Sequence, residues 1–377
     1  MNSAEQMFYL IRNEISGAPL PVGVEYDLKN IYRLSKLHDI AHLIGDALFR
    51  NKLLPEDNVG EAFKNQMMLA VLRTEQQNAE LKRICSALEE AKIPYIPLKG
   101  AVIRNLYPEP WMRTSCDIDI LVKKEDLQNA INYLVKMLNY KKGIEGSHDI
   151  SLMSHSDVHI ELHYDTIEEN RAKKSNKVLE NVWDYTYNTT EYMYKLNDEM
   201  FYFYHITHMA KHIENGGCGI RPFIDLYLLN QKMCYNNKSD LIEKAGLLKF
   251  EKLCVDLSEY WFDGGIKYDD LSLLEEYVLM GGVYGNSTNN ILLNQQKFGG
   301  KSKYILSRIF VPYEILKFKY PVLQKQKWLL PIMEVRRWFE ALFHGRIGTR
   351  VNELQKAKNS SKEQKENVKK LFKALDL

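Results

Sequence analysis

The segment that most constrains the fold is the hexapeptide Asp117–Val122, which reads Asp-Ile-Asp-Ile-Leu-Val. Its β-branched and apolar residues predict a buried strand. Side chains alternate along a strand, so Asp117 and Asp119 share one face at a spacing of about 6–7 Å. Two like charges at this distance repel unless a positive charge lies between them. Because carboxylate oxygens suit Mg²⁺ and Mn²⁺, the pair predicts a divalent metal site on a sheet.

A second segment, residues 157–164, alternates strictly between polar and apolar side chains. This pattern predicts a strand with Asp157, His159, Glu161 and His163 on one face. An edge strand with a solvated polar face would have the same sequence. If the strand instead lies beside Asp117–Val122 with the polar faces matched, Glu161 becomes a third carboxylate for the same metal site.

Upstream of the two aspartates, residues 93–98 form a short apolar run with two prolines, which favours an edge or terminal strand. Lys99-Gly100 follows, and residues 101–107 read as a helix that ends before Pro108. A strand, a Lys-Gly turn and a helix together place backbone N–H groups where an anion could bind. The alternative is that Gly100 only serves the turn.

The remainder of the chain reads as mostly helical. Residues 61–91 lack Pro and Gly and predict one long helix, whereas residues 281–303 are rich in Gly, Asn and Ser and predict a loop around a short helical piece, a candidate lid. From Asn352 onward, polar residues predict a surface helix or a frayed tail. The expected fold class is α+β, with a small mixed β-sheet core. We expect three domains: an N-terminal helical segment (1–90), an α/β core (91–190) and a C-terminal helical domain (191–377).

Three histidines in the C-terminal domain lie on one face of a predicted helix. His205, His208 and His212 have the spacing i, i+3 and i+7, which suits a transition metal but also suits residues that line a cleft or complete core hydrogen bonds. Farther along, Arg221 and Asp225 are spaced for an i, i+4 ion pair.

Composition excludes some function classes. The net charge of +2 over 377 residues gives no global case for nucleic acid, although about 18 of the 51 Lys and Arg residues lie after residue 300. No apolar run approaches the length of a membrane span, so we expect no membrane partner. Five scattered cysteines without a CxxC motif favour a reduced, cytoplasmic protein.

Four short motifs follow one another in a recognisable order. They are Lys99-Gly100, Arg113, Asp117-Ile118-Asp119 and His159-Ile160-Glu161-Leu162-His163. Over about residues 90–165 the chain resembles the uncharacterised nucleotidyltransferase family of the polymerase-β-like nucleotidyltransferase superfamily. The resemblance implies a transferase that moves a nucleoside monophosphate from an NTP, with ATP the expected donor, to a hydroxyl on a small molecule or a protein. Pyrophosphate would be released.

The resemblance also implies roles for the site residues. Asp117 and Asp119 would bind two divalent metal ions, Mg²⁺ or Mn²⁺, and Glu161 would hold the nucleophile-side metal and could act as the base. Lys99 and Gly100 would meet the triphosphate. Arg113 would reach phosphate or form a salt bridge to one of the two aspartates. The remaining nucleotide-binding candidates are His163 and His212.

The Lys99-Gly100 turn departs from the family pattern, because enzymes of this superfamily usually carry Gly-Ser or Gly-Gly there. A noncatalytic nucleotide-binding regulatory module is therefore an alternative function. A nucleic-acid modifier that uses the basic C-terminal segment is a third, but no aromatic-basic recognition motif supports it, and we do not expect a nucleic-acid partner.

Overall fold

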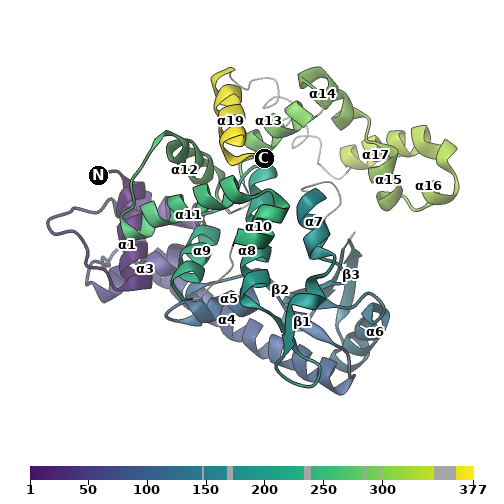
Figure 1. The fold of residues 1–377 in the computed structure, drawn as a ribbon, viewed down its shortest axis with the longest axis horizontal. Helices are drawn as coiled ribbons and strands as arrows, with labels where there is room; N and C mark the ends of the chain where they lie inside the picture. The colour runs from purple at the N-terminus through teal and green to yellow at the C-terminus, as the bar shows by residue number, and fades with distance from the viewer. Residues whose placement is uncertain (147, 168–172, 233–238, 284, 298, 344–361) are drawn as a thin grey trace.

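The computed structural model describes residues 1–377 except 147, 168–172, 233–238, 284, 298 and 344–361. Figure 1 shows a small sheet with helices on its faces, the N-terminal helices to one side and the C-terminal helices above. The expected α+β class with a mixed sheet is confirmed.

The main sheet has five strands in the order β1-β2-β5-β4-β3. Their bounds are β1 (Tyr95–Pro97), β2 (Asp117–Val122), β3 (Lys141–Glu145), β4 (Asp149–Met153) and β5 (His159–His163). Strands β2 and β5 are parallel, and the other neighbours are antiparallel. Pro97 is accommodated in β1 because this strand forms an edge of the sheet, as its sequence predicts.

The register of β2 and β5 matches their polar faces. Asp117 lies opposite His159 and Asp119 lies opposite Glu161. The alternate residues of both strands, such as Ile120, are buried against α4 (Asn58–Glu90) and α6 (Leu127–Leu138). One face of the sheet therefore belongs to the core, and the other carries the charged side chains.

The N-terminal region is helical, as predicted. Asn2 and Glu5 form a capping box at the start of α1, in which each side chain accepts a hydrogen bond from the other residue's backbone N–H. The predicted long helix is α4, which spans 33 residues and packs against α6. The other helices here are α1 (Ser3–Ser16), α2 (Leu28–Leu37) and α3 (Ala41–Arg50).

Short helices connect the strands of the core. These are α5 (Gly100–Ile103), η1 (Arg104–Leu106), η2 (Pro110–Met112), α7 (Lys173–Leu179) and η3 (Val182–Tyr185). A two-stranded sheet of β6 (Thr186–Asn188) and β7 (Tyr194–Leu196) then leads into the C-terminal helices. The sequence analysis did not identify this hairpin, because each strand is only three residues long.

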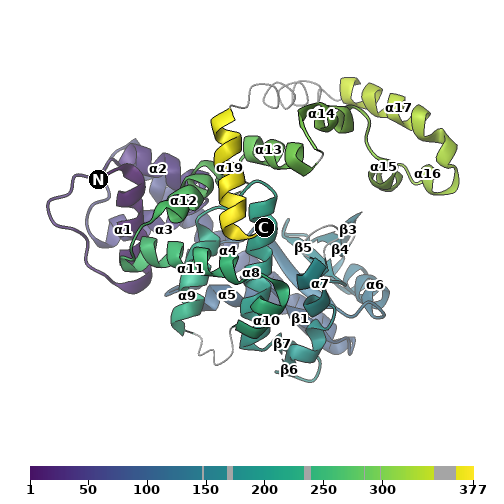
Figure 2. The same ribbon diagram turned by 45° about the horizontal axis from the view of Figure 1, so that its top comes forward.

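Helix α8 (Asp198–Glu214) is largely buried, with Phe203 and Ile206 fully enclosed. The helices that follow it are α9 (Arg221–Lys232), α10 (Ser239–Ala245), α11 (Leu248–Asp263) and α12 (Asp269–Gly281). Figures 1 and 2 show α8 and α9 on the side of the sheet opposite α4. They therefore stand over the charged face of the sheet.

Residues 281–303 contain more helix than expected, because α13 (Ser287–Lys297) is followed closely by α14 (Lys301–Ile309). Strand β3 was not predicted, because every residue in it is exposed and it shows no apolar alternation. Of the surface helix and the frayed tail predicted from Asn352 onward, the described residues show the helix, α19 (Lys362–Leu375), which packs on α11 and α12. Residues 352–361 lie outside the described part.

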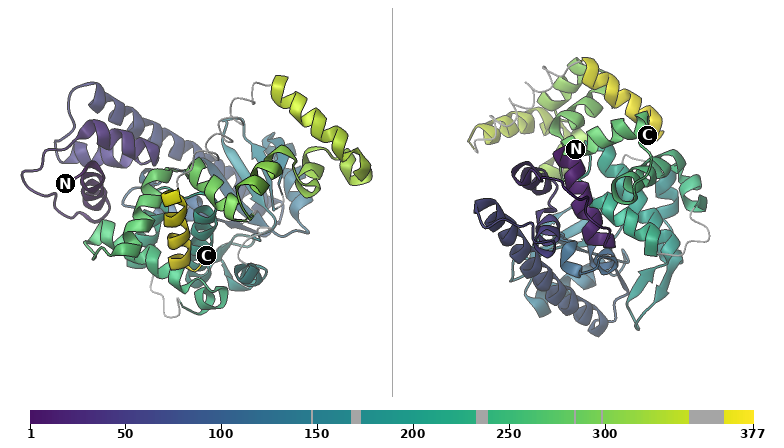
Figure 3. Two further views of the ribbon diagram at one scale, coloured as in Figure 1. Left: turned by 90° about the horizontal axis from the view of Figure 1, so that it is seen from above. Right: turned by 90° about the vertical axis from the view of Figure 1, so that its left-hand side faces the viewer.

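The remaining helices form a lobe that stands out from the body in Figures 2 and 3. Its elements after α14 are α15 (Tyr313–Lys319), α16 (Val322–Lys325), η4 (Lys327–Leu329) and α17 (Leu330–Phe343). These helices agree with the mostly helical character predicted for the rest of the chain.

Candidate active site

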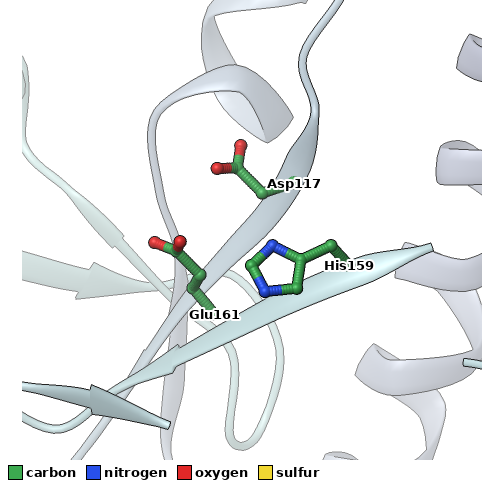
Figure 4. Close-up of side chains that lie close together, drawn as sticks. All are labelled: Asp117, His159 and Glu161. Carbon is green, nitrogen blue, oxygen red and sulfur yellow. The ribbon is translucent and has the colours of Figure 1, made fainter. Parts of the chain in front are cut away.

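The structure brings the three predicted carboxylates together on the polar face of the sheet. Asp117 and Asp119 come from β2, and Glu161 comes from β5. Two groups of potential metal ligands result: Asp117 with His159 and Glu161 (Figure 4), and Asp119 with Glu161 and His163. Within each group the ligand atoms lie within 4.8 Å of one another. Glu161 belongs to both groups, so it links the two aspartates.

Asp119 is the most enclosed of the three acids. Its Oδ1 lies 2.8 Å from the Nζ of Lys99 and 2.8 Å from the Nε2 of His163. Burial alone would raise the pKa of Asp119, but Lys99 and His163 outweigh burial and lower it. The hydrogen bonds to Asp119 and Glu161 in turn outweigh the burial of His163 and raise its pKa. The Asp119 carboxylate is therefore held ionised.

The other two acids have different environments. Burial and the nearby charge of Asp119 raise the pKa of Asp117, which is half-buried. Glu161 lies 3.5 Å from the Nε2 of His163, and the hydrogen bond from His163 lowers its pKa. Glu161 is thus an ionised carboxylate with 26% of its side chain exposed. A group that is both charged and accessible can accept a proton from a bound molecule.

The Lys99-Gly100 turn is tightly constrained. Lys99 has a φ of +44°, a left-handed conformation that costs a non-glycine residue about 1–3 kcal/mol. A Cβ at Gly100 would lie 3.1 Å from both Arg113 and Ser115, which explains why glycine occupies this position. The turn aims the ammonium group of Lys99 at Asp119.

Arg113 binds a residue that the sequence analysis did not connect to it. Its Nη2 lies 2.9 Å from the Oδ2 of Asp225 on α9, and the hydroxyl of Tyr107 donates to the other oxygen of that carboxylate at 2.7 Å. The expected salt bridge from Arg113 to a β2 aspartate is therefore wrong. The predicted ion pair between Arg221 and Asp225 is also wrong. Arg221 instead pairs with Asp39, with its Nη1 3.3 Å from the Oδ2 of Asp39.

A cavity of about 320 Å³ lies between the charged face of the sheet and helices α8 and α9. The core contributes Lys99, Gly100, Arg113, Asp117, Asp119 and Glu161 to its lining, and the helices contribute Tyr204, His205, His208, Lys211, His212 and Asp225. The C-terminal helices thus form the opposite wall of the cavity. Among the predicted site residues, His163 lies behind Asp119 and lines a smaller adjoining cavity with Lys99.

Comparisons with known proteins agree with this geometry. The family described as uncharacterised nucleotidyltransferase matches residues 25–263, which contain both walls of the cavity. The chain belongs to the uncharacterised nucleotidyltransferase family. It is accordingly an enzyme of the transferase class, as the resemblance implies.

Two further comparisons are weaker. A solution structure of the antibiotic-resistance factor ANT(2'')-Ia is 13% identical, covers 46% of this chain and 90% of its own, and gives a TM-score of 0.32. No curated protein matches the chain. In the described parts of this nucleotidyltransferase, no helix combines the length and the apolar character that crossing a membrane requires.

The three histidines of α8 line the cavity but do not form a metal group. The Nε2 of His205 lies 3.0 Å from the carbonyl oxygen of Pro222, and the Nε2 atoms of His208 and His212 lie 2.9 Å apart. No group of metal ligands found among the described residues contains them. Burial lowers the pKa of His205 and of His208, and Lys99 adds to the effect on His208. These observations support the cleft-lining alternative.

Sequence reasoning assigned no role to His159, whose ring lies beside Asp117 and Glu161 in Figure 4. The signal was present, because His159 shares the polar face of the alternating strand. Tyr204 and Lys211, which line the cavity from the helical wall, were also not predicted from the sequence. Their positions on a largely apolar helix carried no comparable signal.

Proposed function

We propose that this nucleotidyltransferase transfers a nucleoside monophosphate from an NTP to a hydroxyl acceptor in the cytoplasm. We expect ATP as the donor, and Mg²⁺ or Mn²⁺ as the cofactor. The observation that supports this most directly is the parallel register of β2 and β5, which pairs Asp119 with Glu161. In this register each aspartate forms a group of potential metal ligands with Glu161 and one histidine.

The residues present fit a divalent metal. Asp117 and Asp119 each place an oxygen ligand near Glu161, and such a row of carboxylates is costly without a cation nearby. In the structure, the ammonium group of Lys99 partly meets this need at Asp119. When bound, the metal would supply positive charge that offsets the negative charge of the reacting phosphates.

The reaction exchanges a phosphoanhydride bond for a phosphoester bond. The acceptor oxygen forms a bond to the α-phosphorus, while the bond from that phosphorus to the bridging oxygen of the β-phosphate breaks. The electron pair of the broken bond leaves with pyrophosphate. The acceptor proton passes to the carboxylate of Glu161, which is ionised and partly exposed.

The other residues of the cavity position the two substrates. The backbone of the Lys99-Gly100 turn faces the cavity and would bind the triphosphate, while Lys99 adds a positive charge beside it. Tyr204 and His212 from α8 lie on the opposite wall, where they would contact the base or the acceptor. The acceptor is then a hydroxyl compound, a small molecule or a protein side chain, that fits between these walls.

The Asp117→Asn/Asp119→Asn double variant tests this function. With ATP and Mg²⁺ or Mn²⁺, and with water and glycerol as surrogate acceptors, we expect pyrophosphate release to fall about 10³-fold, which corresponds to about 4 kcal/mol of lost transition-state stabilisation. Asp157→Asn is the matched control, because Asp157 is an exposed carboxylate just before β5. Circular dichroism would check that both variants fold. Equal turnover in the wild type and the double variant would refute the proposal.

A further inference from the structure

The imidazole of His159 lies among the carboxylates of the site. His159 stands on β5 directly opposite Asp117 on β2, two residues before Glu161. The ligand atoms of these three residues lie within 4.8 Å of one another, and Figure 4 shows the ring beside both carboxylates. This group therefore offers a metal one nitrogen and two carboxylates.

A residue on the next strand fixes the orientation of this ring. The Oγ of Ser151 lies 2.7 Å from the Nε2 of His159, and Ser151 stands on β4 opposite Glu161. With Nε2 engaged, Nδ1 is the nitrogen left for a metal. Metal-binding histidines usually have such a hydrogen bond on their second nitrogen, which fixes the ring and its tautomer. The hydrogen bond between Ser151 and His159 thus matches the one that orients a histidine ligand at a metal site.

The other histidine of the face differs in this respect. The Nε2 of His163 already lies 2.8 Å from Asp119 and 3.5 Å from Glu161. It is therefore engaged with the carboxylates themselves, and it holds Asp119 in place from behind. Of the two histidines, only His159 has its hydrogen bond directed away from the acids.

We propose that Asp117, His159 and Glu161 form a mixed nitrogen and oxygen metal site that selects Mn²⁺ over Mg²⁺. Mg²⁺ prefers an all-oxygen environment with several waters, whereas Mn²⁺ accepts both carboxylate and imidazole and binds more tightly to nitrogen-containing sites. The inference rests on the proposed function for its biological meaning. It revises the expectation that carboxylates alone hold the metal.

Pulsed electron paramagnetic resonance of the Mn²⁺-loaded protein, without nucleotide, tests the ligand directly. The wild type should show modulation from a directly coordinated ¹⁴N nucleus, and His159→Gln should lose it. His163→Gln and the exposed His155→Gln are matched controls that should keep it. Absence of ¹⁴N modulation in the wild type, or its persistence in His159→Gln, would overturn the proposal.

Metal competition measures the selectivity. The wild type should bind Mn²⁺ at least about tenfold more tightly than Mg²⁺, and His159→Asp should narrow that ratio. Ser151→Ala should weaken Mn²⁺ binding about tenfold, and Ser151→Thr should restore it, because the hydroxyl orients the ring. A ratio unchanged in His159→Asp would count against the site. Neither readout needs turnover, so nitrogen coordination without pyrophosphate release would refute only the proposed function.

Discussion

At the scale of single residues, the contact between Lys99 and Asp119 decides the charge balance of the site. The Nζ of Lys99 lies 2.8 Å from the Oδ1 of Asp119, and Asp119 is almost completely buried. Removing one partner of a buried pair leaves the other charge uncompensated, which costs about 3–5 kcal/mol. Because Asp119 is also a potential metal ligand, a divalent cation can replace the lost ammonium charge.

Lys99→Met should therefore lower the free energy of unfolding by about 3 kcal/mol in metal-free buffer. Added Mn²⁺ should raise the midpoint of thermal unfolding more in the variant than in the wild type, because the metal then has no competing ammonium group. Calorimetry with and without Mn²⁺ measures both effects. Lys82→Met, at an exposed position of α4, is the control. An equal metal-induced rise in both proteins would contradict the prediction.

The positions of the acids could be predicted from the sequence, but their cationic partners could not. The two-residue period of a strand places Asp117 and Asp119 on one face whatever the fold, and the same period places Glu161. Lys99 and Arg113 have long side chains whose partners depend on which segments the fold brings near. Asp225, the partner of Arg113, is 112 residues away in sequence.

At the scale of elements, helices and strands with a periodic apolar pattern were predicted well. Strands β2 and β5 follow such a pattern, whereas helix α4 was predicted from its long run without Pro or Gly. Strand β3 has no buried residue, so its sequence carries no alternation to detect. Half of the residues of helix α19 are charged, so its sequence left a surface helix and a frayed tail both open, although Val368, Leu371 and Leu375 are apolar. These three residues recur at i, i+3 and i+7 and are all buried.

Leu371→Ala tests whether α19 belongs to the folded body. Leu371 is 1% exposed and packs within the main hydrophobic cluster, so truncation should cost about 3 kcal/mol of unfolding free energy. Urea denaturation measures the loss. Lys370→Ala, the neighbouring exposed position, should change stability little. If the helix were a frayed tail, the two substitutions would have equally small effects.

At the scale of the whole molecule, the cavity depends on contacts between segments distant in sequence. Arg113 joins the segment before β2 to Asp225 on α9, and Arg221 joins α9 to Asp39 in the N-terminal helices. The three regions thus meet at the cavity, on the charged side of the sheet. The helical character of this wall could be predicted from the sequence, because helix follows helix after residue 198. The ion pairs that hold this wall in place could not be predicted from the sequence, because the i, i+4 spacing suggested Arg221 as a local partner for Asp225.

A double-mutant cycle on Arg113 and Asp225 distinguishes a structural clamp from a phosphate contact. Arg113→Ala and Asp225→Ala should each cost about 3–5 kcal/mol of unfolding free energy, because each leaves a buried charge unpaired. The double variant should lose less than the sum of the two, by about 2 kcal/mol, since the pair is already broken in each single variant. Urea denaturation gives these values, and Arg33→Ala on α2 is the exposed control.

ATP affinity, measured by calorimetry, should fall by a similar factor in both single variants, because both loosen the same wall. A loss of affinity confined to Arg113→Ala, with little loss of stability, would show instead that the guanidinium binds phosphate.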